Sequence, residues 1–592
     1  MENYYKRELE KLSHFYEADD SDAEGLFFHD QNHDHQENLP FATKDILKGF
    51  ARLSASLQEQ LHDKDHFLKA VAKQIAPDAE LPVPCLTLLE VDPVNLQRVK
   101  LLAKGSVIES GAVSLPDGSS QICSFTTLHQ INVAPIRLGT AQLLAPSDYR
   151  SYFAHSDLNP SLARIIQLDF STLTASLSEL RLPDLHFHFT GKYADASNLY
   201  YLFQYYLESI ELITEGPDPS VLSLQKKDLC FPDLHHIIRF NKPALNESFT
   251  LDALREYFLF PQALLYCRLD LSSWMQQSGQ SFSLRFIFRE CPFELTEQIL
   301  RQIKIHCVPA VNLFPREAKP VAIVNPFADI PIGFRQKINE AVDLYRITSI
   351  KGISGAGGNK TRYFQNITSK VMHPDQQNPT YHLKVREHIK NRHRSYYVHL
   401  AYTDLLDIIE KETLSVGLEC TNQHLPEEMN PEEMNKQGPG FLQNMIFKNL
   451  TRPTRYKPSN IQDAEMTILT RVQLNQSLLT KLEGLTYLLK YYAAYADQKN
   501  LVERKIQGIS SLHLVKEDKV FRGSLVKGNL IEIGVRGSHF ESEGDIFLFG
   551  SILNSIYANR ATFNTFSQMI MTDVETGRSL TWLPEFNQES IS

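Results

Sequence analysis

The chain has 592 residues, of which 42% are hydrophobic and 22% charged, and its formal net charge is −10. This length predicts about three to five domains, each large enough to bury a core. The acidic balance argues against a broad surface for nucleic acid or anionic lipid, because both need clustered Lys and Arg. No run approaches the ~20 apolar residues of a membrane span, so we expect no direct membrane insertion.

The first seventeen or so residues are predicted to form a helix. Tyr4, Tyr5, Leu9 and Leu12 recur at spacings near 3.6, as on one helical face. The segment is charged and aromatic where a secretion signal would need a continuous apolar stretch. We therefore expect a cytoplasmic protein.

Residues 18–38 are acidic and rich in histidine. His29, His33 and His35 are interspersed with aspartates that could help to hold zinc, but sizeable apolar side chains occur only at residues 26–28 and give too little support to fix ligand geometry. The pattern favours a solvated loop over a metal site, and we expect neither metal nor cofactor.

Residues 45–75 carry the clearest helical pattern in the chain. Thr43 is a suitable N-cap, and Pro77 marks the end. The apolar stripe includes Ile46, Phe50, Leu53, Leu57 and Leu61. Periodicity leaves two interpretations open, a core helix or one half of a helical bundle with a partner protein.

The middle of the chain alternates between predicted strands and predicted helices. Strands are expected within 81–91, 121–136, 163–170, 186–190, 263–271 and 281–290, and helices over 198–213, 295–305, 462–495 and 549–558. Strands without regular βαβ spacing predict an α+β multidomain protein: N-terminal long helices, then β-rich modules, then a C-terminal α+β domain. The predicted boundaries are 1–80, 81–315, 316–465 and 466–592.

Two motifs could carry chemistry. Residues 352–361 read GISGAGGNKT, but a P-loop would need glycines where Ser354 and Asn359 stand, so a flexible loop is expected. Residues 381–399 concentrate cations that include Arg386, Lys390, Arg392 and Arg394. A solvated surface, a face that docks an acidic protein, and an anion or nucleic-acid site all remain open for this stretch, in that order of preference.

The seven cysteines form no CxxC pair, and most have apolar neighbours. Their spacing predicts buried, reduced thiols rather than a disulfide framework or a structural zinc site. A reducing, cytoplasmic environment follows from this prediction.

Several sequence blocks resemble, in order, those of the TssF family of the type VI secretion system. They include YYKREL (4–9), KGFARLSASL (48–57), CSFTTLHQINVAPI (123–136), LREYFLFPQALLYCRLDL (254–271), CVPAVNLFPREAKPV (307–321), LTRPTRYKP (450–458), LNQSLL (474–479) and GDIFLFGSILNSIYANRATFNTFSQMIM (544–571). The chain departs from the family pattern in residues 18–38, which are acidic where an apolar, Pro-containing stretch is common.

The resemblance implies a non-enzymatic structural subunit of the baseplate wedge, similar to that of contractile phage tails. It implies pairing with a second copy of the chain, binding to TssG, and contacts with TssK, TssE and the VgrG hub at the cytoplasmic face of the inner membrane. It also implies that the N-terminal helices join a bundle with TssG. The alternative from another class is a glycan- or anion-binding module, or a hydrolase, of a cell-envelope complex.

Overall fold

A computed structural model describes the chain over most of its length. The described residues are 68, 81–114, 118–144, 162–173, 176–215, 220–234, 249–272, 274, 279–333, 341–354, 360–367, 379–387, 394–402, 412–437, 445–458, 479–521, 523–559 and 565–586. The chain divides into two compact units, 1–80 with 460–473, and 81–459 with 474–592. The fold below is that of the second unit. The predicted N-terminal helices lie outside the described residues, apart from Leu68.

The first sheet of the second unit has six strands and brings distant parts of the chain together. Its strand order is β24–β3–β4–β15–β1–β25. The strands are β1 (Leu86–Asp92), β3 (Val107–Ser114), β4 (Ser120–Thr127), β15 (Cys307–Val311), β24 (Lys436–Gln437) and β25 (Ile446–Asn449), and β2 (Lys100–Leu102) pairs with β5 (Ile131–Val133) beside them. Antiparallel register places Leu89 of β1 opposite Val308 on one side and Asn449 on the other.

Two further sheets share one large core. The five-stranded sheet has the order β10–β9–β13–β7–β6, and the four-stranded sheet has the order β11–β12–β8–β14. Their strands are β6 (Ile136–Leu144), β7 (Arg164–Thr172), β8 (Asp184–Phe189), β9 (Leu207–Glu215), β10 (Ser220–Leu224), β11 (Leu229–Cys230), β12 (Tyr266–Asp270), β13 (Ser281–Phe288) and β14 (Ile303–Ile305). Phe170 stacks on Phe282, and Phe187 meets Phe286 edge to face, so aromatic rings fill the space between the sheets.

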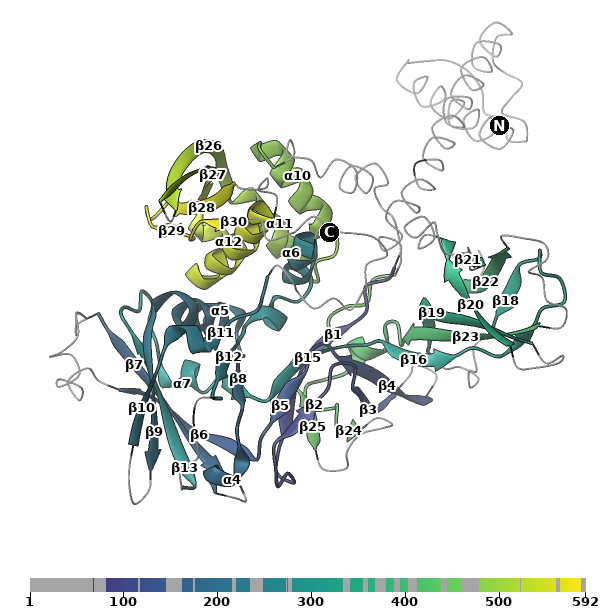
Figure 1. Cartoon of the computed structure of the whole chain (residues 1–592), viewed down its shortest axis with the longest axis horizontal. Helices are drawn as coiled ribbons and strands as arrows, with labels where there is room; N and C mark the ends of the chain where they lie inside the picture. The colour runs from purple at the N-terminus through teal and green to yellow at the C-terminus, as the bar shows by residue number, and fades with distance from the viewer. Residues whose placement is uncertain are drawn as a thin grey trace, which may run out of the picture. The chain divides into compact units, whose positions relative to one another are not determined.

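An eight-stranded sheet forms a module with its own core (Figure 1). Its order is β16–β23–β19–β20–β21–β22–β18, with β17 paired to β23. The strands are β16 (Phe314–Glu317), β17 (Val321–Ala322), β18 (Ile330–Ile332), β19 (Asp343–Ser354), β20 (Lys360–Asn366), β21 (Thr380–Glu387), β22 (Arg394–Ala401) and β23 (Glu412–Thr421).

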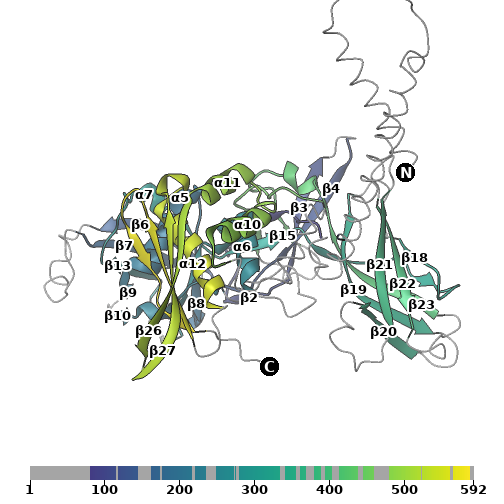
Figure 2. The same ribbon diagram turned by 90° about the horizontal axis from the view of Figure 1, so that it is seen from above.

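The C-terminal sheet is built on a long hairpin. β26 (Ile509–Phe521) pairs with β27 (Ser524–Val535), and β27 runs parallel to β28 (Phe566–Asp573). The short strands β29 (Ser579–Thr581) and β30 (Glu585–Phe586) both pair with β28. Gly523 at the hairpin tip has φ of +83°, a backbone conformation that glycine adopts at no steric cost. Figure 2 shows the hairpin extending past the neighbouring strands.

Helices are short and gather mainly around the shared core. They are α4 (Leu177–Leu180), α5 (Tyr193–Tyr201), α6 (Phe249–Leu259), α7 (Glu297–Leu300), α10 (Leu482–Ala493), α11 (Lys499–Gln507) and α12 (Glu543–Ala558), with single turns of other helix types at η4 (Leu202–Tyr206), η5 (Lys226–Asp228), η6 (Pro261–Leu264), η8 (Leu425–Glu428) and η9 (Gly537–His539). Every residue of α12 after Glu543 is buried, as expected for a helix that is apolar all round. Its side chains join the core of the five- and four-stranded sheets.

The predicted α+β class is wrong, because the described residues are mostly β, with 49% in strands and 21% in helices. Aromatic and apolar runs compatible with a helical period caused the error. The predicted helix over 198–213 ends at Tyr206, and the chain continues as strand β9. The predicted helix over 295–305 contains only the single turn α7 before strand β14 begins. The division into four domains stays a prediction.

Candidate functional site

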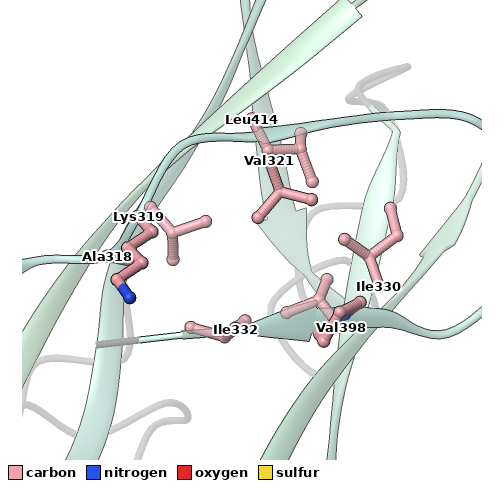
Figure 3. Close-up of a pocket in the computed structure, with 9 residues that line it drawn as sticks. Ala318, Lys319, Val321, Ile330, Ile332, Val398 and Leu414 are labelled. Atoms are coloured by element: carbon pink, nitrogen blue, oxygen red, sulfur yellow. The ribbon is translucent and has the colours of Figure 1, made fainter. Parts of the chain in front are cut away.

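The pocket in the eight-stranded module is a packing gap rather than a ligand site. It is lined by Ala318, Lys319, Val321, Ile330, Pro331, Ile332, Val398, Leu414 and Val416. Figure 3 shows the labelled aliphatic side chains converging on one small space. The cavity measures about 10 Å³, close to the space of a single water and far below the ~300 Å³ of a small-molecule site.

A buried ion pair joins helices α11 and α12. Lys505 Nζ lies 2.8 Å from Asp545 Oδ2 and 2.9 Å from Oδ1, and the two side chains are only 6% and 0% exposed. Asp545 stands in the first turn of α12, where the helix dipole favours a negative charge. Its backbone N–H donates to Ser542 Oγ, which caps the helix.

Two tyrosines from the middle of the chain complete this cluster. Tyr193 on α5 and Tyr257 on α6 donate their hydroxyls to Asp545 Oδ1, at 2.7 and 2.6 Å. Burial, followed by the Asp545 carboxylate, raises the pKa of both phenols well above the ordinary value. Both hydroxyls therefore remain protonated donors. We call Tyr193, Tyr257, Lys505 and Asp545 the buried joint, because the cluster ties α5 and α6 to α11 and α12.

Helices α5 and α12 also touch through their backbones. The N–H of Gly544 donates to Asn198 Oδ1 at 2.9 Å, and the hydroxyls of Ser197 and Ser542 lie 2.8 Å apart. A Cβ at Gly544 would meet the carbonyl oxygen of Ser197 at 2.1 Å. Only glycine allows this approach, which explains the first residue of the GDIFLFG block.

Gly544→Ala is expected to lower the free energy of unfolding by about 1–3 kcal/mol, because the added methyl group must push two helix backbones apart. Gly139→Ala is the matched control, since its Cβ would meet only ordinary contact at 3.5 Å. Urea denaturation followed by tryptophan fluorescence measures both variants. Equal midpoints for the two would contradict the close contact between α5 and α12.

Four histidines lie around the four-stranded sheet: His186, His188 and His306 are buried, and His129 is half-buried. Burial lowers the pKa of His129 and His306 to about 3 and that of His186 and His188 to about 4. The Ala134 N–H donates to His306 Nε2 at 3.2 Å, and His188 Nε2 lies 2.8 Å from the Gln262 carbonyl oxygen. These histidines are neutral at physiological pH.

Within the described ranges, no group of three or more His, Cys, Asp or Glu is placed to hold a metal ion. His29, His33 and His35 lie outside those ranges.

The cysteines are mostly buried, as their apolar neighbours indicated. Cys85, Cys123, Cys267, Cys307 and Cys420 are buried, whereas Cys230 is exposed. Burial raises the pKa of the Cys123 thiol to about 12, so this side chain behaves as a small apolar group.

In the cation-rich stretch over 381–399, the described residues 381–387 lie in β21 and 394–399 lie in β22. Lys384 Nζ and Arg386 Nη2 each lie 2.8 Å from a carboxylate oxygen of Asp329, and His399 Nδ1 lies 3.1 Å from it. Side chains alternate between the two faces of a strand, and Arg394 lies on the face of the sheet opposite to Lys384 and Arg386. Its guanidinium lies 4.0 Å from the buried Asp343. The structure therefore separates Arg386 from Arg394.

The remaining predicted interface residues lie outside the described residues. They are Tyr4, Tyr5, Leu9, Leu12, Ile46, Phe50, Leu53, Leu57, Leu61, Lys390 and Arg392. The buried joint, in contrast, was missed at the sequence level. The sequence did contain a usable signal. Asp545 is the single charged residue in the largely apolar segment 544–558, and a buried charge needs a partner.

These features define a large protein that is mostly β over its described residues, and its buried joint holds segments of the chain together. No helix within the described ranges is both long and apolar enough to cross a membrane. The family model "Type VI secretion system, TssF" matches residues 40–589. The chain belongs to the TssF family, and TssF is a baseplate subunit of the type VI secretion system.

Known proteins support this assignment along most of the chain. TssF1 of Pseudomonas aeruginosa, a type VI secretion system component, is 22% identical over 588 residues, with 91% of each chain covered. A chain of the TssK-TssF-TssG baseplate subcomplex is 20% identical with a TM-score of 0.72, covering 92% of this chain and 99% of that one. A chain of another type VI baseplate complex is 15% identical with a TM-score of 0.56 and 99% coverage of both chains. These likenesses establish a shared fold.

Proposed function

We propose that this chain is a structural subunit of the baseplate wedge, which binds TssG and TssK and pairs with a second copy of itself. Contacts with TssE and the VgrG hub complete the proposed platform on which the contractile tail assembles. The observation that carries the proposal is the family match over residues 40–589. The similar chain solved within a TssK-TssF-TssG subcomplex supports the choice of partners.

The proposed role is non-enzymatic and cytoplasmic, at the inner membrane through partners. A subunit that transmits contraction needs several large contacts, since obligate interfaces bury extensive apolar surface. The buried joint suits this role, because it links segments more than 200 residues apart in the sequence within one core. Force applied to one segment would be carried to the other through packed side chains.

The apolar stripe of residues 45–75 is the proposed contact with TssG. Burial of each large apolar side chain in a helical bundle contributes roughly 1.5–3 kcal/mol. Leu53→Arg combined with Leu57→Arg is expected to abolish co-purification with TssG, because two charges would enter the apolar seam. Affinity purification after co-expression measures this effect.

Val221→Arg is the matched control, because Val221 is 64% exposed on β10 and its substitution should leave the TssG yield unchanged. The double variant must also keep the thermal unfolding midpoint of the second compact unit. If the double variant co-purified as much TssG as the wild-type chain does, the proposed helical bundle between residues 45–75 and TssG would be contradicted.

A further inference from the structure

The loop between β17 and β18 holds apolar side chains in solvent. Val324 is 94% exposed and Phe327 is 59% exposed. Asn325 Oδ1 accepts the N–H of Phe327 at 3.0 Å, and the Asn325 carbonyl accepts the N–H of Ala328 at 3.3 Å. These bonds, together with the fixed φ of Pro326, form a tight turn that presents both apolar side chains outward. We call residues 323–328 the apolar loop.

The apolar loop ends at Asp329, where cations of β21 converge. Lys384 and Arg386 are two residues apart on one strand, so they lie on one face. Their side chains stay 42% and 59% exposed while contacting Asp329. Arg386 also lies over the ring of Tyr397, which is opposite Lys384 on β22. We call Lys384, Arg386 and Tyr397 the basic face.

The basic face carries excess positive charge. Hydrogen bonding from Lys384 and then from His399 lowers the pKa of Asp329, so this carboxylate is ionised at neutral pH. One carboxylate still faces two permanent cations, which leaves one positive charge. A guanidinium has five N–H donors in a planar fork, and Arg386 donates to Asp329 through Nη2, so it keeps donors directed to solvent.

We propose that the apolar loop and the basic face together form a docking surface for an acidic segment of another baseplate protein. Val324 and Phe327 enter an apolar pocket of that partner, and carboxylates at the pocket rim bind Lys384 and Arg386. Aromatic and arginine side chains carry much of the energy of protein interfaces, and opposite charges set the orientation. This inference rests on the proposed function, since the partner belongs to the same assembly.

A protein partner fits this surface better than a membrane does. Adsorption to anionic lipid relies on clusters of about four to eight cations. Among the described residues of this face, Lys384 and Arg386 are the fixed cations, and they share Asp329. Their fixed spacing suits paired carboxylates of a folded partner.

A photo-cross-linker tests the proposal in cells that carry the complete secretion system. Phe327 of the full chain is replaced by p-benzoylphenylalanine, and the cross-linked peptide is identified by mass spectrometry. We expect one baseplate protein, cross-linked at a segment with Asp or Glu. Lys384→Glu combined with Arg386→Glu should lower the cross-linking yield at least tenfold. Replacing the partner's Asp or Glu residues at the cross-linked segment by Lys should restore that yield.

A second variant separates the apolar contact from the ion cluster. Val324→Ser with Phe327→Ser leaves Asp329 and its cations intact and should weaken binding to the identified partner at least tenfold. The same cross-linker at Val221 is the control for chance contacts. Three results would overturn the proposal: a cross-linking yield at position 327 no greater than that at position 221, cross-links to lipid, or a cross-linking yield that does not change when Lys384 and Arg386 are replaced by Glu. TssG co-purification is measured in the same cells: its loss from the unmodified chain would refute the proposed function, whereas its retention without a cross-link refutes only this surface.

Discussion

Asp545→Asn is expected to lower the free energy of unfolding by about 3–5 kcal/mol, because it leaves the Lys505 ammonium buried without a counter-charge. The asparagine Oδ1 can still accept from Tyr193 and Tyr257. Its amide NH2 replaces the Oδ2 that accepts from Lys505 and from the Glu541 N–H, so the loss combines the missing charge with these two hydrogen bonds. Urea denaturation gives the measurement. Trp582 is a suitable reporter, because it stacks on Phe547 of α12 at 5.7 Å.

A second charge change should reverse much of this loss. Lys505→Met added to Asp545→Asn removes the unpaired ammonium, and a neutral buried cluster costs far less than an unpaired charge. Lys499→Met is the control on the same helix, since Lys499 pairs with Glu503 in solvent and should contribute under about 0.5 kcal/mol. If the single and double variants were equally unstable, the joint would not depend on its ion pair.

Acid is expected to destabilise the chain steeply below about pH 6.5, which is the pKa of histidine in an unfolded chain. His129, His186, His188 and His306 have folded-state pKa values of about 3 to 4. The unfolded state therefore binds more protons, and stability falls as pH falls through 6.5 until the folded-state values are reached. Each of these histidines contributes at most about 1.4 kcal/mol per pH unit within this window.

Single histidine variants distinguish this cause from general acid effects. His306→Asn should reduce the slope of stability against pH by about 1.4 kcal/mol per pH unit between pH 6 and 5. Asparagine also tolerates the positive φ of +55° at this position. His513→Asn, at an exposed position on β26, should leave the slope unchanged. A slope insensitive to His306→Asn would show that another group titrates.

Short strands could be predicted where β-branched and aromatic residues alternate between turn residues. The predicted strands over 263–271 and 281–290 are confirmed as β12 and β13. Helix ends could not be placed in aromatic segments. In the predicted helix over 198–213 the side chains fit either period, and pairing of β9 with β13 decides for a strand after Tyr206.

The buried joint shows why a site made by tertiary contact escapes local patterns. Asp545 indicated that a partner must exist, but its partners stand 40, 288 and 352 residues away. No spacing rule links such positions. Resemblance, in contrast, identified the family directly, because many blocks occur in the same order along the chain.

The mass of the complex formed by the intact chain tests the assembly role most directly. The chain is co-expressed with TssG and TssK, purified through an affinity tag, and measured by native mass spectrometry. We predict one discrete complex that contains two copies of this chain with TssG and TssK. Recovery of the chain as a solitary monomer, with both partners present and folded, would contradict the account.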